Sequence, residues 1–359
     1  MCRVRKHPTK SLWASRTLRQ TCLALLLLYL CTGLLRYFSH GTALRELQQV
    51  SAVACCHLLD VRVENFRLAV NSWLAVNEIS EIILVDWKSP IPIADVLKVE
   101  LTRFRGTGTV LQVLRGPNES NPEKSWRIGA AFNLALSSVR EDYILKLDCD
   151  TWLHRDFIKA NQLSNIGFRY GNYINARDDN DNHLNGVFFA RTAYLREVHG
   201  FDERLDMYGW DDSDLYLRLE EKVRDKFKFA YDDFVRDTHG VSTITHLHHS
   251  RTGNLAVEIA GICFNKDCIS QAEPWDGMER NRYEEKQRNV NGQIEVRELL
   301  LLHVAPPIQK TLEISVCVNL ALNCLNYAGA PLHEAASMCS TTWEHINSTS
   351  IGSLTESTT

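Results

Sequence analysis

Apolar runs alternate with stretches of helical spacing through the first part of the chain. The apolar runs predict strands at residues 50–56, 81–86 and 110–114, and apolar residues recur at helical spacing over 63–76 and 95–104. Strands that alternate with helices in this way indicate β-α-β units. The pattern therefore predicts an α/β fold with a parallel-rich mixed sheet.

This alternation continues into the part of the chain that is richest in polar motifs. A helix is predicted over 125–139, and the apolar strand that follows it stops on Asp148 and Asp150. Asp86 stands in the same position at the end of an earlier strand. Functional residues of α/β sheets gather at these carboxyl ends, where the connecting loops form a crevice. These acids are therefore the first candidates for a site.

The N-terminal residues predict a membrane anchor. A basic stretch without acids precedes an apolar run that has about the length a bilayer core requires. A cleaved signal peptide is the alternative, because the leucine-rich core is short and small residues follow it. Under both interpretations the rest of the chain lies in the lumen of the secretory pathway or outside the cell, where disulfides form. The expected parts are a cytosolic tail (1–20), a transmembrane anchor (21–38), a short stem (39–50), the α/β domain (51–300) and a partly disordered C-terminal extension (301–359).

Composition narrows the class of protein. With 45% apolar and 23% charged residues, the chain is ordinary for a globular protein, and its net charge of -4 argues against a nucleic-acid partner. The cysteines beyond the apolar run permit disulfides, but their spacing gives no pairing and no C-x-x-C zinc pattern. A bridge between Cys263 and Cys268 is the pairing we expect.

The pair Asp148 and Asp150 has the chemistry of a cation site. Two carboxylates one residue apart can share a hard cation, or one can hold the cation and the other a ribose hydroxyl. Such oxygen ligands suit Mg²⁺ or Mn²⁺. Taken alone, the motif is explained better by the solvated end of a strand than by a metal site, with Cys149 between the acids facing the sheet.

Two later stretches add titratable groups. Asp211, Asp212 and Asp214 begin a predicted helix after a Gly-Trp pair, and three acids exceed what one helix N-terminus needs. Histidines follow in Thr-His-Leu-His-His-Ser-Arg (245–251), where an imidazole could bind the same cation or relay a proton. The acidic stretch 175–182 lacks the glycine and glutamate of an EF-hand, so we expect a mobile solvated loop there.

In this order the motifs resemble those of metal-dependent glycosyltransferases of the GT-A fold. The resemblance is to the galactosyltransferase C-terminal-domain type, seen in β1,4-galactosyltransferases and chondroitin-synthase-like enzymes, and it covers about residues 52–252. The matching positions are Asp148-Cys-Asp150, Asn185-Gly186, Gly200-Phe201, Gly209–Asp214 and His249-Ser-Arg251.

The resemblance assigns roles to these positions. It implies that Asp212 is the catalytic base. It implies that Mn²⁺ or Mg²⁺ is held by Asp148, Asp150 and His249. It implies nucleotide-sugar contacts for Asp86, Arg127, Asn133 and Asp148, although a surface charge explains Arg127 equally well. It implies acceptor or sugar contacts for Gly186, Gly209, Trp210 and Asp211. The chain departs from the family pattern at Trp210, Asp211 and Ser213, so its acceptor contacts can differ.

These roles imply an inverting enzyme that moves a hexose or N-acetylhexosamine, of the galactose, GalNAc or GlcNAc type, from a UDP-sugar to a glycan. With the anchor, the chain would be a single-pass type II protein of the Golgi or another secretory-pathway membrane. Two alternatives stay open. A catalytically inactive glycan-binding relative would have lost its cation site, and a metal-dependent nucleotidyltransferase would not need the Gly-Trp-Asp-Asp helix start.

Overall fold

The computed structural model places the central part of the chain. The described residues are 48–58, 62–87, 89–101, 108–116, 127–163, 167–205, 209–227, 229–247, 265, 273–278, 280, 282–291 and 294–303. All of them except Gln48 belong to one compact unit, Gln49–Thr359. The predicted anchor, His249, the Cys263–Cys268 pair and the chain beyond 303 lie outside the described residues. Within these ranges, no helix is long and apolar enough to cross a membrane.

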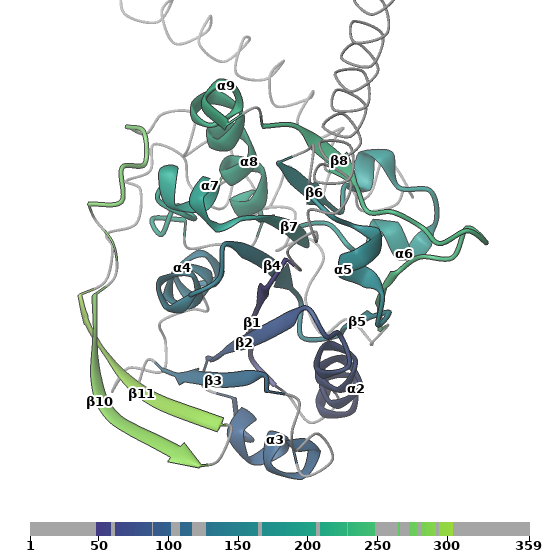
Figure 1. The fold of residues 1–359 in the computed structure, drawn as a ribbon. Helices are drawn as coiled ribbons and strands as arrows, with labels where there is room; N and C mark the ends of the chain where they lie inside the picture. Colours follow the sequence, from purple (N-terminus) through teal and green to yellow (C-terminus); the bar gives the residue numbers. More distant parts are fainter. Residues whose placement is uncertain are drawn as a thin grey trace, which may run out of the picture. The chain divides into compact units, whose positions relative to one another are not determined.

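A nine-stranded sheet organises this unit (Figure 1). Its order is β10-β11-β3-β2-β1-β4-β7-β6-β8, and the run from β11 to β4 is parallel. The strands are β1 (Val50–Cys56), β2 (Ile79–Asp86), β3 (Val110–Arg115), β4 (Tyr143–Leu147), β6 (Phe168–Tyr170), β7 (Phe188–Arg191), β8 (Tyr231–Asp233), β10 (Arg282–Asn291) and β11 (Ile294–His303). The predicted α/β class with a parallel-rich mixed sheet is confirmed.

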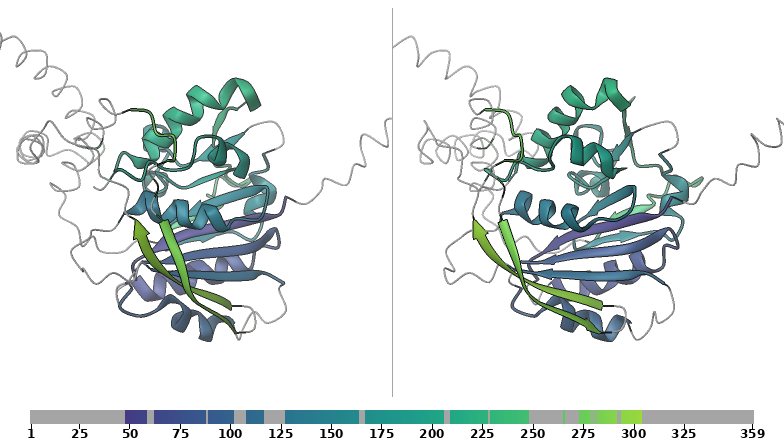
Figure 2. Two further views of the ribbon diagram at one scale, coloured as in Figure 1. Left: turned by 90° about the vertical axis from the view of Figure 1, so that its left-hand side faces the viewer. Right: turned by 60° about the vertical axis from the view of Figure 1, so that its left-hand side comes forward.

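Helices cover both faces of the sheet, as the views in Figure 1 and Figure 2 show. Ala52 and Ala54 enter the core beneath the first two helices, whereas Val53 and Cys55 enter the core beneath α4, because successive strand residues point to opposite faces. The helices are α2 (Val63–Leu74), α3 (Ile93–Leu101), α4 (Ile128–Ser138), α5 (Phe157–Ala160), α6 (Asp179–Asn182), α7 (Thr192–Glu197), α8 (Asp211–Lys222) and α9 (Arg224–Phe227), with a 3₁₀ turn η2 (Tyr173–Asn175).

A small second sheet lies beside the carboxyl end of β4. It pairs β5 (Thr151–Leu153) with β9 (Ile244–His246) in antiparallel fashion. The indole N–H of Trp73 on α2 donates to the Thr151 carbonyl at 2.7 Å, which ties this sheet to the main core. Two segments about ninety residues apart in sequence thereby meet next to the Asp148–Asp150 loop.

A disulfide joins Cys56 at the end of β1 to Cys149, with the Cα atoms 5.9 Å apart. The sequence did not predict this pairing, because Cys149 was expected to face the sheet between its two aspartates. The bridge forms because β1 and β4 are neighbouring parallel strands whose carboxyl ends lie side by side. It fastens the loop that carries both acids to the central strand of the sheet. Cys55 is a free, buried cysteine.

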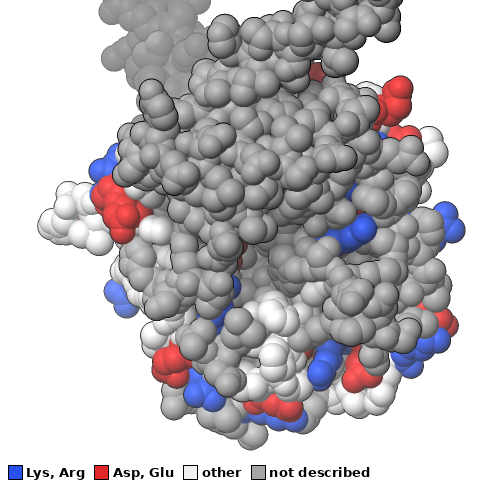
Figure 3. Space-filling model, turned by 180° about the vertical axis from the view of Figure 1, so that it is seen from behind, with Lys and Arg blue, Asp and Glu red and all other residues white. Residues whose placement is uncertain are grey.

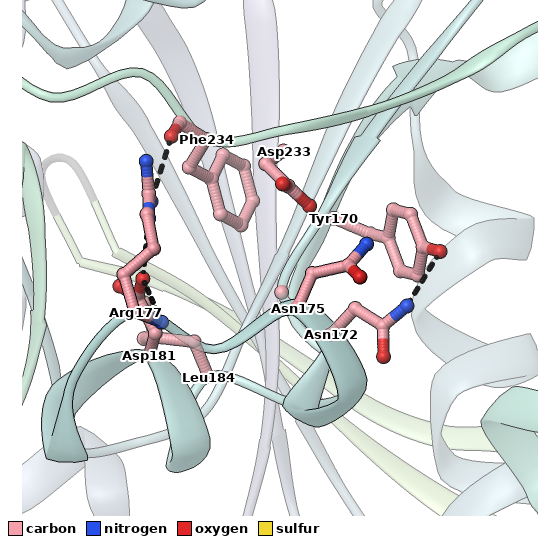
Figure 4. Close-up of a pocket in the computed structure, with 9 residues that line it drawn as sticks. Tyr170, Asn172, Asn175, Arg177, Asp181, Leu184, Asp233 and Phe234 are labelled. Carbon is pink, nitrogen blue, oxygen red and sulfur yellow. Dashed lines mark hydrogen bonds and ion pairs between the residues drawn. The ribbon is translucent and has the colours of Figure 1, made fainter.

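The stretch 175–182 includes helix α6 rather than forming a loop throughout, which corrects that part of the expectation, while several of its residues are exposed to solvent as predicted. Asp178 caps α6 by accepting from the Asp181 N–H at 2.9 Å. Asp181 in turn accepts from Nε of Arg177 at 2.7 Å and from Arg236 at 3.0 Å. Figure 4 shows Arg177 and Asp181 facing each other at one side of a small pocket, with Phe234 above them. Ion pairs to neighbouring segments therefore fold these acids into the structure.

Strand β11 extends the domain slightly beyond its predicted end at 300, since it pairs with β3 and runs to His303. On β10 and β11, Arg297 pairs with Glu285 at 2.7 Å and Arg288 pairs with Glu295 at 2.8 Å.

Seen from behind, the described lysine and arginine residues lie among the acidic ones (Figure 3). Charges of both signs are thus mixed over the described part of that face.

Candidate active site

Asp148 and Asp150 lie in the loop between β4 and β5. Asp150 is only 6% exposed, and its Oδ1 lies 3.5 Å from Nε2 of His246. Burial raises the pKa of Asp148, and the carboxylates of Asp150 and Asp212 raise it further, whereas Lys146 and His246 act in the opposite direction. The carboxylates therefore repel one another, and a cation among them would relieve that repulsion.

His246 reaches Asp150 through the pairing of β9 with β5. The next N–H, of Leu247, donates to the Asp150 carbonyl at 2.7 Å. The imidazole also stacks on His183, with the ring centres 5.0 Å apart. The sequence predicted a histidine ligand from this segment but assigned it to His249, which lies outside the described residues. His246 is the histidine of the segment that the described structure brings to the acids.

These groups fit a divalent cation such as Mn²⁺. A buried carboxylate oxygen and an imidazole nitrogen lie within the spacing of two ligands of one ion. Carboxylate oxygens suit Mn²⁺, and imidazole nitrogens bind divalent transition-metal ions. Across the described ranges, no cluster of three His, Cys, Asp or Glu side chains forms a complete cation site. Asp150 and His246 would therefore supply part of a coordination shell, with Asp148 beside them.

Helix α8 begins from an uncommon backbone conformation. Gly209 (φ 87°) and Trp210 (φ 67°) both occupy the left-handed region directly before it. A bulky side chain is rare there, and such strain tends to be retained at functional sites. Asn265 steadies the turn by donating from Nδ2 to the Gly209 carbonyl at 2.7 Å. The turn sets the direction in which the acids of α8 point, while the sugar contacts implied for Gly209 and Trp210 stay predictions.

The last acid of the cluster has a structural role. Asp214 is buried and accepts from Nη2 of Arg218 at 2.5 Å and from its Nε at 2.9 Å. The same guanidinium donates to the carbonyls of Val198 and Gly200, both at 2.7 Å. Asp214 therefore orients the arginine that fastens α8 to the preceding turn.

Asp211 and Asp212 differ in access. Asp211 is 6% exposed, and burial together with the Asp212 charge raises the pKa of Asp211 to about 7, against the opposing effect of Lys146. Oδ2 of Asp211 is buried and has no hydrogen-bond partner among the described residues. The side chain of Asp212 is 18% exposed and sits 3.3 Å from the Lys146 ammonium. Asp212 is thus the more accessible of the two, and the acceptor contact implied for Asp211 stays a prediction.

Lys146 is a site residue that the sequence reasoning missed. It is 2% exposed, and it interacts with the charges of Asp212, Asp148 and Asp211. One indication was available in the sequence, namely a single lysine inside the apolar strand Tyr143–Leu147, because a buried charge requires a partner. The lysine links the acids of the β4 loop to the acids of α8.

The Asn133 side chain is occupied by partners within the protein, which does not support the predicted nucleotide contact. It is 5% exposed, and its Nδ2 donates to the Phe201 carbonyl and to Oε1 of Glu203, both at 2.8 Å. Its Oδ1 accepts from the Phe201 N–H at 2.8 Å. A Cβ on Gly200 would lie only 2.1 Å from that oxygen, which is one reason for a glycine at this turn. Asn133 is a clamp between α4 and the Gly200-Phe201 turn.

Replacing Asn133 by alanine should therefore lower stability rather than nucleotide affinity. Three hydrogen bonds are lost and buried partners are left unsatisfied, so we expect the free energy of unfolding to fall by about 2 kcal/mol. Urea denaturation measures this effect, and Ser137→Ala, at an exposed position of the same helix, is the control with little expected change. A variant with a normal free energy of unfolding and weakened UDP binding would instead support the predicted nucleotide contact.

Asp86 also has a structural position. It is fully buried, and its two oxygens accept from the N–H groups of Ser89 at 3.0 Å and Ile93 at 3.1 Å, so it orders the loop that leads into α3. This arrangement does not support the predicted uracil or ribose contact. Arg127 is partly exposed at the N-cap of α4, and its nucleotide contact stays a prediction.

The comparisons with known proteins give structural neighbours only. No protein-family model matches the chain, and no curated protein matches its sequence. The structure is similar to Drosophila β1,4-galactosyltransferase 7, solved as a mutant in complex with manganese, UDP-Gal and xylobiose, with 15% identity, a TM-score of 0.43 and coverage of 70% of this chain and 94% of that chain. It is also similar to the catalytic domain of the same Drosophila enzyme in complex with xylobiose, with 14% identity, a TM-score of 0.43 and coverage of 71% and 94%.

A third solved structure shows a similar degree of likeness. The mannosyltransferase PcManGT from Pyrobaculum calidifontis, in complex with GDP-Man and Mn²⁺, has 12% identity, a TM-score of 0.43 and coverage of 90% of both chains. These structural neighbours are glycosyltransferases. Identities and TM-scores at this level do not assign an activity, so the function is argued below from the site.

Proposed function

We propose that this protein is a metal-dependent inverting glycosyltransferase of the GT-A fold, which moves a hexose or N-acetylhexosamine from a UDP-sugar to a glycan. One observation carries the proposal. The cation-type ligands Asp150 and His246 lie near Asp148, and so does the partly exposed carboxylate of Asp212, which pairs with Lys146. A cation site and a separate base are the two parts that single-displacement transfer from a nucleotide sugar requires.

The donor side of the site would use the β4–β5 loop. Asp150 and His246 would hold Mn²⁺ or Mg²⁺, with Asp148 beside them for the cation or for a ribose hydroxyl. When bound, the ion would supply positive charge that stabilises the departing diphosphate. The Cys56–Cys149 bridge supports this role, because it limits the motion of the loop between the two acids.

The chemical step would use Asp212. Its carboxylate accepts the proton of an acceptor hydroxyl while that oxygen forms a bond to the anomeric carbon of the donor sugar. The bond between that carbon and the diphosphate oxygen breaks, and the electron pair leaves with UDP. Attack from the side opposite to the leaving group inverts the anomeric configuration.

The location of the protein is part of the proposal. A lumenal domain behind an N-terminal anchor, in a type II protein of the Golgi or another secretory-pathway membrane, agrees with the apolar run at 21–38. The Cys56–Cys149 disulfide supports an oxidising compartment, because such bonds are rare in the cytosol. A glycan acceptor belongs to the same compartment.

A panel of UDP-sugars tests the activity. The purified protein is incubated with Mn²⁺, each UDP-sugar and a mixture of glycan acceptors, and the release of UDP and the sugar product are measured. We expect turnover with one of the galactose, GalNAc or GlcNAc donors and an inverted linkage in the product. Glycan binding without turnover of any donor would favour the inactive relative. Pyrophosphate release from a nucleoside triphosphate and a sugar phosphate would favour a nucleotidyltransferase.

A further inference from the structure

Lys146 is a charged residue buried at a position where an apolar side chain is expected. It lies in the interior of β4 with 2% exposure and points to the same face of the strand as Ile144. Its ammonium lies 4.4 Å from the ring centre of Phe132 and about 6 Å from those of Phe188 (6.0 Å) and Phe201 (5.9 Å). An apolar side chain would fill this place without the desolvation penalty of a charge.

The charged form of Lys146 is stabilised by what lies at its tip. Burial disfavours the ammonium, and the polar contacts at its tip offset that penalty. Its Nζ donates to the Gly186 carbonyl at 2.6 Å and lies 3.3 Å from Oδ1 of Asp212. The ammonium thus bridges the Gly186 carbonyl, just before β7, and Oδ1 of Asp212.

Gly186 contacts the other oxygen of the same carboxylate. A Cβ at this glycine would lie 2.2 Å from Oδ2 of Asp212, and its φ of 85° also disfavours other residues. Oδ1 of Asp212 is buried and makes no hydrogen bond among the described residues, so its contact with Lys146 is an ion pair. Because the side chain as a whole is 18% exposed, Oδ2 is the oxygen that an incoming hydroxyl can approach.

We propose that Lys146 and Gly186 together position the catalytic carboxylate of Asp212, with Lys146 holding Oδ1 and Gly186 leaving the space in which Oδ2 meets the acceptor hydroxyl. The inference rests on the proposed function of Asp212 as base. Lys146 touches no substrate in this scheme. It is a positioning residue that acts through Asp212.

The test compares Lys146→Met with the wild-type protein. Misplacing a reacting group by about 1 Å can lower the rate by about 10²-fold, so we expect kcat for transfer to fall by about that factor. The Kd for UDP in the presence of Mn²⁺ should stay within about twofold, because the donor side keeps its ligands. Ile144→Met, on the same strand face and also buried, is the matched control and should retain the wild-type kcat.

A double-mutant cycle separates positioning from general structural damage. If Lys146 acts only through Asp212, Lys146→Met should change the residual transfer rate of an Asp212→Asn protein by less than about twofold, since residues that act as a unit are not additive. A further loss of about 10²-fold in that background would overturn the proposal. So would an unchanged kcat of the single variant, or a parallel loss of UDP–Mn²⁺ binding.

Gly186→Ala provides a second route if Lys146→Met does not fold. The added methyl group would displace Oδ2 while Lys146 stays in place, and the same loss of kcat with retained UDP binding is expected. Wild-type kcat in this variant would overturn the proposal. Failure of the wild-type protein to transfer any sugar would instead refute the proposed function, so the two failures are distinguishable.

Discussion

Replacing Asp212 by asparagine should greatly slow sugar transfer while UDP and Mn²⁺ still bind. The amide has nearly the same shape as the carboxylate, but it cannot accept the proton of the acceptor hydroxyl. General-base catalysis contributes about 10²–10⁴-fold, so kcat should fall by that factor. Transfer is measured with the donor found in the UDP-sugar panel, and UDP affinity by calorimetry in the presence of Mn²⁺.

Asp214→Asn is the matched control for this experiment. It makes the same chemical change on the same helix, at the acid that pairs with Arg218 rather than with Lys146. We expect Asp214→Asn to lower stability and to leave kcat of the folded protein unchanged. Loss of nucleotide binding in Asp212→Asn would mean that this acid belongs to the donor site and is not the base.

Replacing Asp150 by alanine should remove the dependence on Mn²⁺ together with the activity. The substitution deletes the buried oxygen that lies nearest to His246 and leaves a cation with fewer ligands. Loss of a coordinating carboxylate should weaken Mn²⁺ binding by at least about 10-fold, the lower end of what even outer-shell substitutions cause. Electron paramagnetic resonance of free Mn²⁺ measures binding in the presence of UDP, and UDP release measures activity.

His246→Ala tests the other half of the same site and should show the same pattern of weaker Mn²⁺ binding and lower activity. Asp156→Ala is the control, because this aspartate follows the same loop but is exposed and pairs with Lys159. Unchanged activity and unchanged Mn²⁺ binding in Asp150→Ala would refute the metal assignment.

Long-range pairing explains why part of the site was not predictable. Cys56 and Cys149 meet because β1 and β4 are neighbours, although the helices α2, α3 and α4 separate them along the chain. His246 approaches Asp150 through the β5–β9 pairing, whereas the family resemblance pointed to His249. The periodicity of apolar residues predicts each helix or strand separately, and it contains no information on which segments pair.

The sequence by itself determined the kinds of element and the places where acids end them. Apolar runs that alternate with helical spacing predicted an α/β fold, because strands and helices that pack together must each bury apolar side chains. The positions of Asp148, Asp150 and Asp212 at the ends of these elements marked the candidate site. The tertiary structure alone decided what each polar residue does. Asn133 and Asp86 became internal clamps because the loops nearest to them supply N–H and carbonyl partners. The role of a polar side chain follows from its partners, and those are fixed only when distant segments pack together.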